Sequence, residues 1–259
     1  MEIMRLKFSV IMPIHNEEKL LHYSLPSVYR LNPDEVILLF DNCKDDSFNI
    51  ASGIVKKYDK DHKKTRFVSD LGDSSEWRFR IAYVKRKGLE LASFDTVLIA
   101  DADTIIHEKV KSHLNMMKYY KHISFSRIDY PINWRSYIKR MIKFIYKKGK
   151  LGGLNAVSVS AYKECEDKEE VKKIITGEDA LLRFSIQKKY PVFYVDSPNI
   201  HLRPKENYFY NYNKGVQFWQ ILKTSFLKVI FSGVVSGRFS LIKGYIHYRY
   251  GKKVESIET

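Results

Sequence analysis

Two aspartates separated by one residue have the chemistry needed to hold a charged substrate. Asp101 and Asp103 directly follow the apolar run Thr96–Ala100. On a turn that leaves a buried strand, both carboxylates can point to the same side, which suits Mg²⁺ or Mn²⁺ with phosphate oxygens as further ligands. A bare D-x-D pattern is also typical of a solvated acidic turn, so its surroundings must decide between the two interpretations.

The elements around these aspartates follow a regular alternation in the first half of the chain. Strands are expected at Phe8–Pro13, Glu35–Phe40, Arg66–Ser69 and Thr96–Ala100, and helices at Glu18–Leu31, Ser47–Tyr58 and Arg80–Ala92. Strands that alternate with helices predict an α/β fold with a mostly parallel sheet flanked by helices. In such sheets the ligand binds at the carboxyl ends of the strands.

Three of the expected strands end in acidic or amide side chains. The endings are Asn16/Glu17, Asp41/Asn42 and Asp101/Asp103. Because the carboxyl ends of parallel strands lie at one edge of a sheet, these groups are expected to converge there. This convergence is the main indication of a site that comes from the residues alone.

The second half of the chain is less regular. Strands are expected at Ile123–Ile128, Ala156–Ser160 and Val192–Val195, and a helix is expected to start at Gly177-Glu178-Asp179. Both carboxylates then lie in the first helical turn, where the helix dipole favours negative charge. Dipole compensation is therefore one interpretation of Glu178 and Asp179.

The order of the motifs resembles that of the family 2 glycosyltransferases. The motifs are Val10-x-x-Pro13-x-x-Asn16-Glu17, VILLFDN at 36–42, Lys85-Arg86-Lys87-Gly88, LIADAD at 98–103, Gly177-Glu178-Asp179 and His201. The resemblance covers roughly residues 7–205 and implies a GT-A (Rossmann-like) fold. It implies a catalytic domain at 1-205, with a nucleotide-binding half at about 1-121 and an acceptor half at about 122-205. A basic, aromatic, helical extension at 206-259 follows.

The resemblance also implies roles for individual residues. The residues implied to bind the donor nucleotide are Pro13, Asn16, Glu17, Asp41, Asn42, Lys85, Arg86 and Asp101. Metal binding falls to Asp101, Asp103 and His201, and general-base catalysis to Asp179 with Glu178 beside it. For Lys85 and Arg86 a solvated helix face is an equal alternative, and for His201 a hydrogen-bonded structural role.

The implied reaction is inverting transfer of one sugar from a nucleotide-diphosphate sugar, with Mn²⁺ or Mg²⁺ as cofactor. The acceptor is expected to be a polyprenyl phosphate, a lipid-linked saccharide or a glycan. The sequence departs from the family where D-D-G-S becomes Asp41-Asn42-Cys43-Lys44 and where R-N-x-G becomes Lys85-Arg86-Lys87-Gly88. The Q-x-x-R-W motif of processive synthases is absent, which favours transfer of a single sugar.

The charge of the chain predicts anionic partners. In its 259 residues, 45 Lys and Arg outnumber 30 Asp and Glu, which gives a net charge of +15. Such an excess favours nucleic acid, an anionic lipid surface or phosphorylated substrates. The two cysteines, Cys43 and Cys165, are too few for a disulfide framework. No signal peptide or spanning segment is recognisable, so a cytoplasmic location is expected.

Two basic, aromatic segments predict contact with a membrane surface. Trp134–Lys150 has one apolar stripe, seven cationic residues and no acid. The region from His201 onward has a second stripe between Phe218 and Phe231, and Tyr245, Tyr248 and Tyr250 resemble interfacial aromatic residues. Such helices can lie on the cytoplasmic face of an anionic membrane, and the alternative is ordinary packing against the domain.

Three other functions compete with glycosyl transfer. A nucleic-acid-binding basic α/β protein would explain the charge but not the acidic strand endings, so no nucleic acid is expected as a partner. A nucleotidyltransferase would be expected to carry a glycine-rich phosphate loop, and 13–17 contains no glycine. A catalytically silent scaffold would not require Asp101, Asp103 and Asp179.

Overall fold

The computed structural model describes residues 5–130, 154–174, 178–202, 212, 215–216, 225–235 and 239–250. Its strands are β1 Ser9–Ile14, β2 Glu35–Phe40, β3 Thr65–Val68, β4 Thr96–Ala100, β5 Thr104–Ile105, β6 His122–Asp129, β7 Leu154–Ser158 and β8 Val192–His201. Its helices are α1 Leu21–Arg30, α2 Ser47–Tyr58, α3 Arg80–Leu91, α4 Lys109–Leu114, η1 Asn115–Lys118, α6 Val159–Cys165, α7 Lys168–Lys173, α8 Glu178–Gln187, α10 Phe226–Val235 and α11 Phe239–Arg249.

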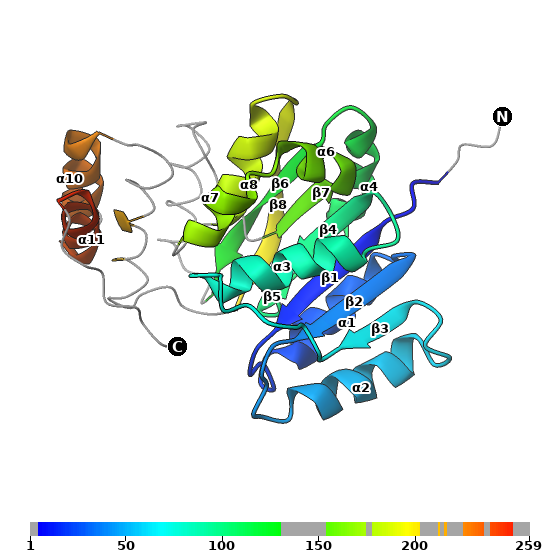
Figure 1. Cartoon of the computed structure of the whole chain (residues 1–259). Coiled ribbons are helices and arrows are strands. Elements are labelled where there is room, and N and C mark those ends of the chain that lie inside the picture. Colours follow the sequence, from blue (N-terminus) through cyan, green and yellow to red (C-terminus); the bar gives the residue numbers. More distant parts are fainter. Residues whose placement is uncertain are drawn as a thin grey trace.

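A single mixed sheet organises the described part of the chain (Figure 1). Its strand order is β3-β2-β1-β4-β7-β6-β8-β5. The first four strands in this order are parallel, as the sequence predicts. The strand β7 is antiparallel to both β4 and β6, while β6 and β8 are parallel. The expected mostly parallel α/β fold is confirmed, with antiparallel pairs confined to the second half.

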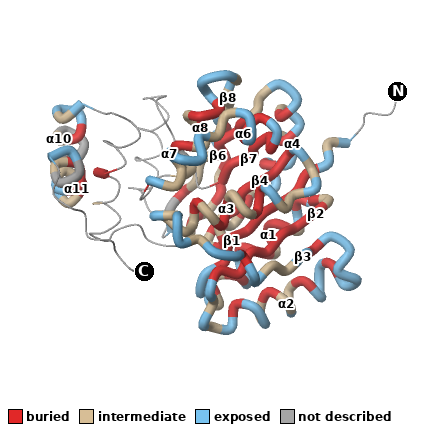
Figure 2. Tube along the Cα trace, viewed as in Figure 1, coloured by how far each residue is buried: buried red, intermediate tan, exposed pale blue. Residues whose placement is uncertain are grey.

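Helices cover both faces of this sheet. On one face, α1, α2, α4 and η1 pack against β1, β2 and β4 through residues such as Leu25, Val55 and Leu114. On the other face, α3, α6 and α8 pack through Val84, Tyr162 and Ile186. All residues of β1, β2, β4 and β7 are buried, and Figure 2 shows this buried layer between the helices. Strands enclosed on both faces explain why these segments are continuous apolar runs.

The expected element boundaries agree closely with the structure in the first half. The bounds of β2, α2 and β4 match the expected ranges. The largest difference is β8, which continues from the expected end at Val195 to His201. The segment Asp196–Asn199 has turn-forming composition, but after a bulge β8 pairs again with β6 and reaches β5. Pairing with neighbouring strands therefore overrides the local turn signal.

The C-terminal helices lie apart from the sheet (Figure 1). Phe226 of α10 stacks on Tyr245 of α11, with ring centroids 5.8 Å apart, and Val229 and Leu241 complete a small separate core. No helix among the described residues is both long enough and apolar enough to span a bilayer. The basic segment 134–150 lies outside the described residues, so its predicted helix stays a prediction.

A glycine in α3 sets how closely this helix approaches the sheet. A Cβ atom at Gly88 would lie 2.7 Å from Leu39 Cδ1 and 2.9 Å from Ile11 Cδ1, and both side chains are fully buried. Gly88→Ala should therefore destabilise the protein by about 1–2 kcal/mol through overpacking. Gly53→Ala is the matched control in α2, where no atom lies within 4 Å of the added methyl group. It should stabilise by up to about 1 kcal/mol through helix propensity. Urea denaturation measures both, and equal stability of the two variants would contradict this packing.

Candidate functional site

The carboxyl ends of β1, β2 and β4 meet at one edge of the sheet. In the parallel register, Ile14 lies opposite Phe40, and Ile11 lies opposite both Ile37 and Ile99. The residues that follow these strands therefore leave the sheet on the same side. The structure thus places the three acidic and amide strand endings at one edge, as the sequence predicts.

Hydrogen bonds join the loops that follow β1 and β2. Asn16 Oδ1 accepts from the backbone N–H of Lys44 at 2.7 Å, and the backbone N–H of Glu17 donates to Ser47 Oγ at 2.7 Å. Asn16 and Asn42 have φ angles of 53° and 48°. Asparagine tolerates this left-handed region better than most residues. Both asparagines therefore shape the backbone of the strand-end loops, whatever contacts they make with a ligand.

Arg80 is a site residue that sequence reasoning missed. Its Nε donates to Asp41 Oδ1 at 2.5 Å, and its Nη1 donates to Ser74 Oγ. Arg80 is the first residue of α3, where the helix dipole disfavours a cation. An arginine in that position was the available signal that an anionic partner lies nearby. The pair fixes the orientation of the Asp41 carboxylate at the end of β2.

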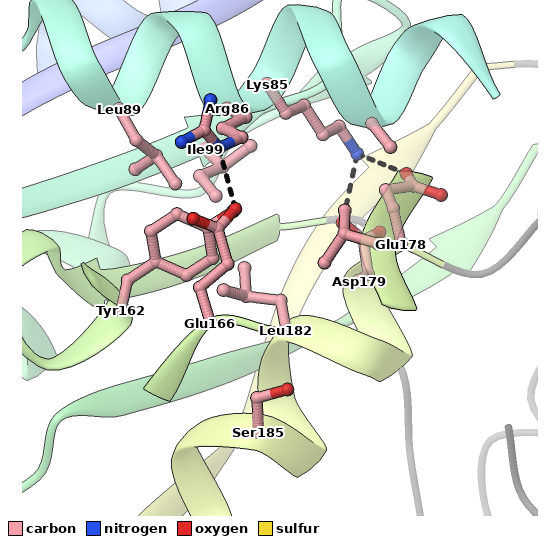
Figure 3. Close-up of a pocket in the computed structure, with 12 residues that line it drawn as sticks. Lys85, Arg86, Leu89, Ile99, Tyr162, Glu166, Glu178, Asp179, Leu182 and Ser185 are labelled. Atoms are coloured by element: carbon pink, nitrogen blue, oxygen red, sulfur yellow. Dashed lines mark hydrogen bonds and ion pairs between the residues drawn. The ribbon is translucent and has the colours of Figure 1, made fainter. Parts of the chain in front are cut away.

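A buried lysine connects three carboxylates at the centre of the site. Lys85 Nζ lies 2.8 Å from Glu178 Oε1, 3.0 Å from Asp179 Oδ1 and 3.3 Å from Asp101 Oδ1. Figure 3 shows Lys85 extending from α3 toward Glu178 and Asp179 in the first turn of α8. We call these four residues the Lys85 cluster. It joins the end of β4 to a helix that lies far away in the sequence.

The charges of the Lys85 cluster perturb one another. Burial acts to lower the pKa of Lys85, but the carboxylates of Asp101, Asp179 and Glu178 outweigh it, so this pKa is raised and the ammonium stays charged. The pKa of Asp179 is raised to about 7, mainly by burial and then by Glu178 and Asp101, against the opposing effect of Lys85. A carboxyl group with this pKa can both accept and release a proton near neutral pH.

The two aspartates of the D-x-D motif have different partners. Asp101 contacts Lys85, and its Oδ2 also lies 3.5 Å from Nη1 of Arg127 in β6. Asp103 Oδ2 lies 3.1 Å from Nε2 of His201, the last residue of β8. The backbone pairing of Thr104 with His201 between β5 and β8 holds these two side chains together. Within the motif, Asp101 therefore contacts the cationic side chains of Lys85 and Arg127, whereas Asp103 contacts His201.

The donor set of Asp103 and His201 fits a divalent cation that also binds substrate. Within the described ranges, no group of three or more His, Cys, Asp or Glu side chains is arranged to enclose a metal. A carboxylate and an imidazole can still hold Mn²⁺ or Mg²⁺ when phosphate oxygens and water complete the coordination. Asp101 is the least suited of the three predicted ligands, because Lys85 and Arg127 already neutralise it.

Arg86 lies away from the strand-end carboxylates. Its Nε donates to Glu166 at 2.7 Å, and its Nη1 lies 2.7 Å from Glu90. In Figure 3, Arg86 and Glu166 lie on the opposite side of a small cavity from Asp179. The cavity measures about 30 Å³, enough for about one water molecule. The structure therefore brings Lys85 to the cluster but gives Arg86 partners on α3 and next to α6.

Comparison with known proteins identifies the family. The sequence pattern described as "Glycosyl transferase family 2" matches residues 9–164, more than half of the chain. The chain belongs to glycosyl transferase family 2. No protein of curated function matches its sequence.

Solved structures similar to this glycosyltransferase share its fold at low sequence identity. S. aureus TarS 1-349 in complex with UDP is 19% identical, with a TM-score of 0.55, and the match covers 82% of this chain but only 65% of the TarS fragment. Glucosyl-3-phosphoglycerate synthase from Mycobacterium tuberculosis, in complex with Mn²⁺, UDP and phosphoglyceric acid, is 15% identical with a TM-score of 0.55. That match covers 83% of this chain and 78% of the synthase. The predicted GT-A fold and glycosyltransferase class are confirmed.

A third similar structure belongs to a different class of enzyme. The 4-diphosphocytidyl-2C-methyl-D-erythritol synthase from Anaerococcus prevotii is 18% identical with a TM-score of 0.50, covering 74% of this chain and 89% of the synthase. Identity this low shows a shared fold and nothing more. The family match therefore decides between the enzyme classes.

One part of the predicted membrane surface of this glycosyltransferase is wrong. Tyr245, expected at an interface with lipid, is fully buried against Phe226 and Leu241. Its position on α11 faces α10, and ring stacking there removes it from solvent. Tyr250 is exposed as expected, together with Leu227 and Phe239. The predicted residues Phe218, Trp219 and Leu222 lie outside the described residues.

Proposed function

We propose that this glycosyltransferase transfers one sugar from a nucleotide-diphosphate sugar to an acceptor, with metal assistance and inversion at the anomeric carbon. The observation that carries the proposal is the gathering of Asp101, Asp103, Asp179 and His201 at the carboxyl edge of the sheet. Ligands of open α/β sheets bind at this edge. Asp101 and Asp103 also lie within residues 9–164, the part of the chain that matches family 2.

The donor nucleotide binds over the loops that follow β1 and β2. Pro13, Asn16, Glu17 and Asn42 form the floor of this region, and Asp41 accepts a hydrogen bond from the nucleobase. Arg80 orients Asp41, since it already occupies one carboxylate oxygen. A uridine nucleotide is the first candidate, because the similar TarS and glucosyl-3-phosphoglycerate synthase structures are complexes with UDP.

Asp103 and His201 hold the divalent cation beside the donor diphosphate. When bound, Mn²⁺ or Mg²⁺ neutralises the negative charge that develops on the diphosphate leaving group. Asp101 lies on the donor side of the Lys85 cluster and orients the ribose. In this assignment the other two carboxylates of the Lys85 cluster, Glu178 and Asp179, lie on the acceptor side.

Asp179 acts as the general base toward the acceptor hydroxyl. It accepts the hydroxyl proton while the acceptor oxygen attacks the anomeric carbon from the face opposite the nucleotide. A single displacement of this kind inverts the anomeric configuration. Glu178 lies beside Asp179 and raises its pKa, which favours proton acceptance near neutral pH.

The acceptor is a lipid-linked group or a glycan, and the C-terminal helices bring the enzyme to a membrane surface. Residues 226–250 contain basic side chains and no acidic ones. Leu227 and Phe239 are 78% and 67% exposed. Exposed apolar side chains in an acid-free pair of helices suit the interface of an anionic bilayer.

The first prediction concerns the metal. UDP with Mn²⁺ should raise the Tm of the protein, since a ligand at 100 times its Kd stabilises by about 2.7 kcal/mol. Asp103→Asn should remove the part of this shift that depends on Mn²⁺. Asp61→Asn is the matched control, because Asp61 pairs only with the exposed Lys63 among the described residues. A Tm shift that is the same with and without Mn²⁺ would show that the metal assignment is wrong.

The second prediction concerns the general base. Asp179→Asn should keep UDP binding and lower kcat by about 100- to 10,000-fold. In the unmodified enzyme, kcat should rise with pH and level off above about pH 7, because the raised pKa of Asp179 must be passed before the base is deprotonated. A flat kcat profile between about pH 5 and about pH 8 would argue against Asp179 as the base.

The third prediction concerns the membrane. Liposomes that contain an anionic phospholipid should sediment the protein at low salt, and high salt should release it, because the Debye length falls from about 10 Å at 0.1 M to about 3 Å at 1 M. The double variant Leu227→Glu, Phe239→Glu should bind more weakly, whereas Tyr23→Glu, at an exposed aromatic residue of α1, should bind normally. Protein that stays in the supernatant at low salt would refute membrane contact.

A further inference from the structure

Lys85 was expected either to bind the donor nucleotide or to lie on a solvated helix face, but the structure buries it and gives its ammonium group other partners. The side chain is only 8% exposed. It donates hydrogen bonds to Glu178 Oε1 and Asp179 Oδ1, and forms an ion pair with Asp101 Oδ1. An ammonium group has three N–H donors and no acceptor. Two carboxylates therefore accept hydrogen bonds from the ammonium group and a third forms an ion pair with it, so the group is already surrounded by carboxylates on the protein.

The partners of Lys85 come from opposite sides of the proposed reaction. Asp101 follows β4 and lies beside the donor, whereas Glu178 and Asp179 open α8 and face the acceptor. Glu178 and Asp179 are separated from Lys85 by 93 and 94 positions in the sequence. The ammonium group is thus a direct link between the strand that carries the donor carboxylate and the helix that carries the base.

The rest of the packing does not by itself set the direction of the Asp179 carboxylate. Leu181 of α8 packs with Ala82 of α3 and with Ile174, and this apolar contact holds the helix against α3. Apolar contacts are not directional, whereas hydrogen bonds to an ammonium group fix the position of each acceptor oxygen. The hydrogen bond from Lys85 therefore sets the direction of the Asp179 carboxylate, which the apolar contacts do not set.

Without Lys85, the cluster would also lose its internal balance of charge. Three carboxylates would face one another, with only Arg127 of the described residues contacting Asp101, at 3.5 Å. Like charges repel strongly where water is scarce. The first turn of α8 would then move away from β4, and Asp179 would move with it.

We propose that Lys85 is a positioning residue that fixes the Asp179 carboxylate relative to Asp101, and that it does not bind the donor diphosphate. It sets the distance between the base and the anomeric carbon of the donor. This inference rests on the proposed function for its catalytic consequence. The arrangement of the four side chains stands independently of it.

The test compares Lys85→Met and Lys85→Arg with Lys87→Met. Lys87 is on the same helix and has no ion pair among the described residues, so its variant controls for the loss of one positive charge. Calorimetric titration with UDP and Mn²⁺ should give a Kd for Lys85→Met within about 3-fold of the unmodified enzyme. Its kcat, taken on the high-pH plateau where Asp179 is deprotonated in both enzymes, should fall by about 100-fold, as expected for a base displaced by about 1 Å.

Lys85→Arg should recover most of the lost kcat, because a guanidinium group can also bridge carboxylates. Lys87→Met should leave both Kd and kcat unchanged. A Kd for UDP that rises more than about 10-fold in Lys85→Met, with kcat unchanged at saturating donor, would overturn the proposal and make Lys85 a phosphate ligand. An unchanged kcat with unchanged Kd would overturn it as well.

A second variant keeps the test decisive if Lys85→Met folds but is too unstable for kinetic measurements. Lys85→Met combined with Glu178→Gln removes one negative charge with the positive one, and should have a higher Tm than Lys85→Met alone. If the Tm of the double variant is not higher, the ammonium does not hold the carboxylates together. If the unmodified enzyme neither binds UDP nor transfers sugar, the proposed function fails, and this Tm comparison still tests the link.

Discussion

Four charged side chains that share one small, partly buried space are the constraint on which the site depends. Asp101, Glu178 and Asp179 all contact the Lys85 ammonium, which lies between them. Carboxylates removed from water at this spacing would otherwise repel one another or bind protons. The ammonium keeps Asp101 and Glu178 close to Asp179, whose pKa rises to about 7 as a result of burial and these neighbours. Lys85 therefore links the carboxylates in space, while burial and the neighbouring carboxylates raise the pKa of Asp179 against the opposing effect of the ammonium.

The sheet makes this arrangement possible by placing the ends of distant segments at one edge. The parallel register of β1, β2 and β4 brings the loops together, and antiparallel β7 adds a second half that returns α8 to the same edge. The site can then keep two positive charges apart, namely the Lys85 ammonium and the proposed metal ion. In the proposed reaction, Lys85 positions the base, and Asp103 and His201, which contact each other, hold the metal ion beside the donor diphosphate. In the proposed reaction both groups act near the donor, and the fold keeps them on different elements, with Lys85 on α3 and His201 at the end of β8.

The sequence predicted those features that depend on local pattern. The apolar runs predicted at Phe8–Pro13, Glu35–Phe40 and Thr96–Ala100 indicated strands because each run is enclosed on both faces, and the residues after them indicated the edge. Features that depend on partners far away were not predictable. The ion pair of Arg80 with Asp41, the link from Lys85 to α8 and the burial of Tyr245 each require the positions of residues more than ten places away. Strand β8 was predicted too short because its last residues have turn composition and become strand only by pairing with β6 and β5.

A crystal structure with Mn²⁺ and UDP tests most directly whether the Lys85 ammonium and the metal ion occupy separate places in the site. Anomalous scattering locates manganese without assumptions about the ligand. The account predicts a manganese peak that contacts Asp103, His201 and the diphosphate, while the ammonium of Lys85 stays hydrogen bonded to Glu178 and Asp179. A structure in which Lys85 has moved to the diphosphate, or in which manganese binds elsewhere, would contradict it.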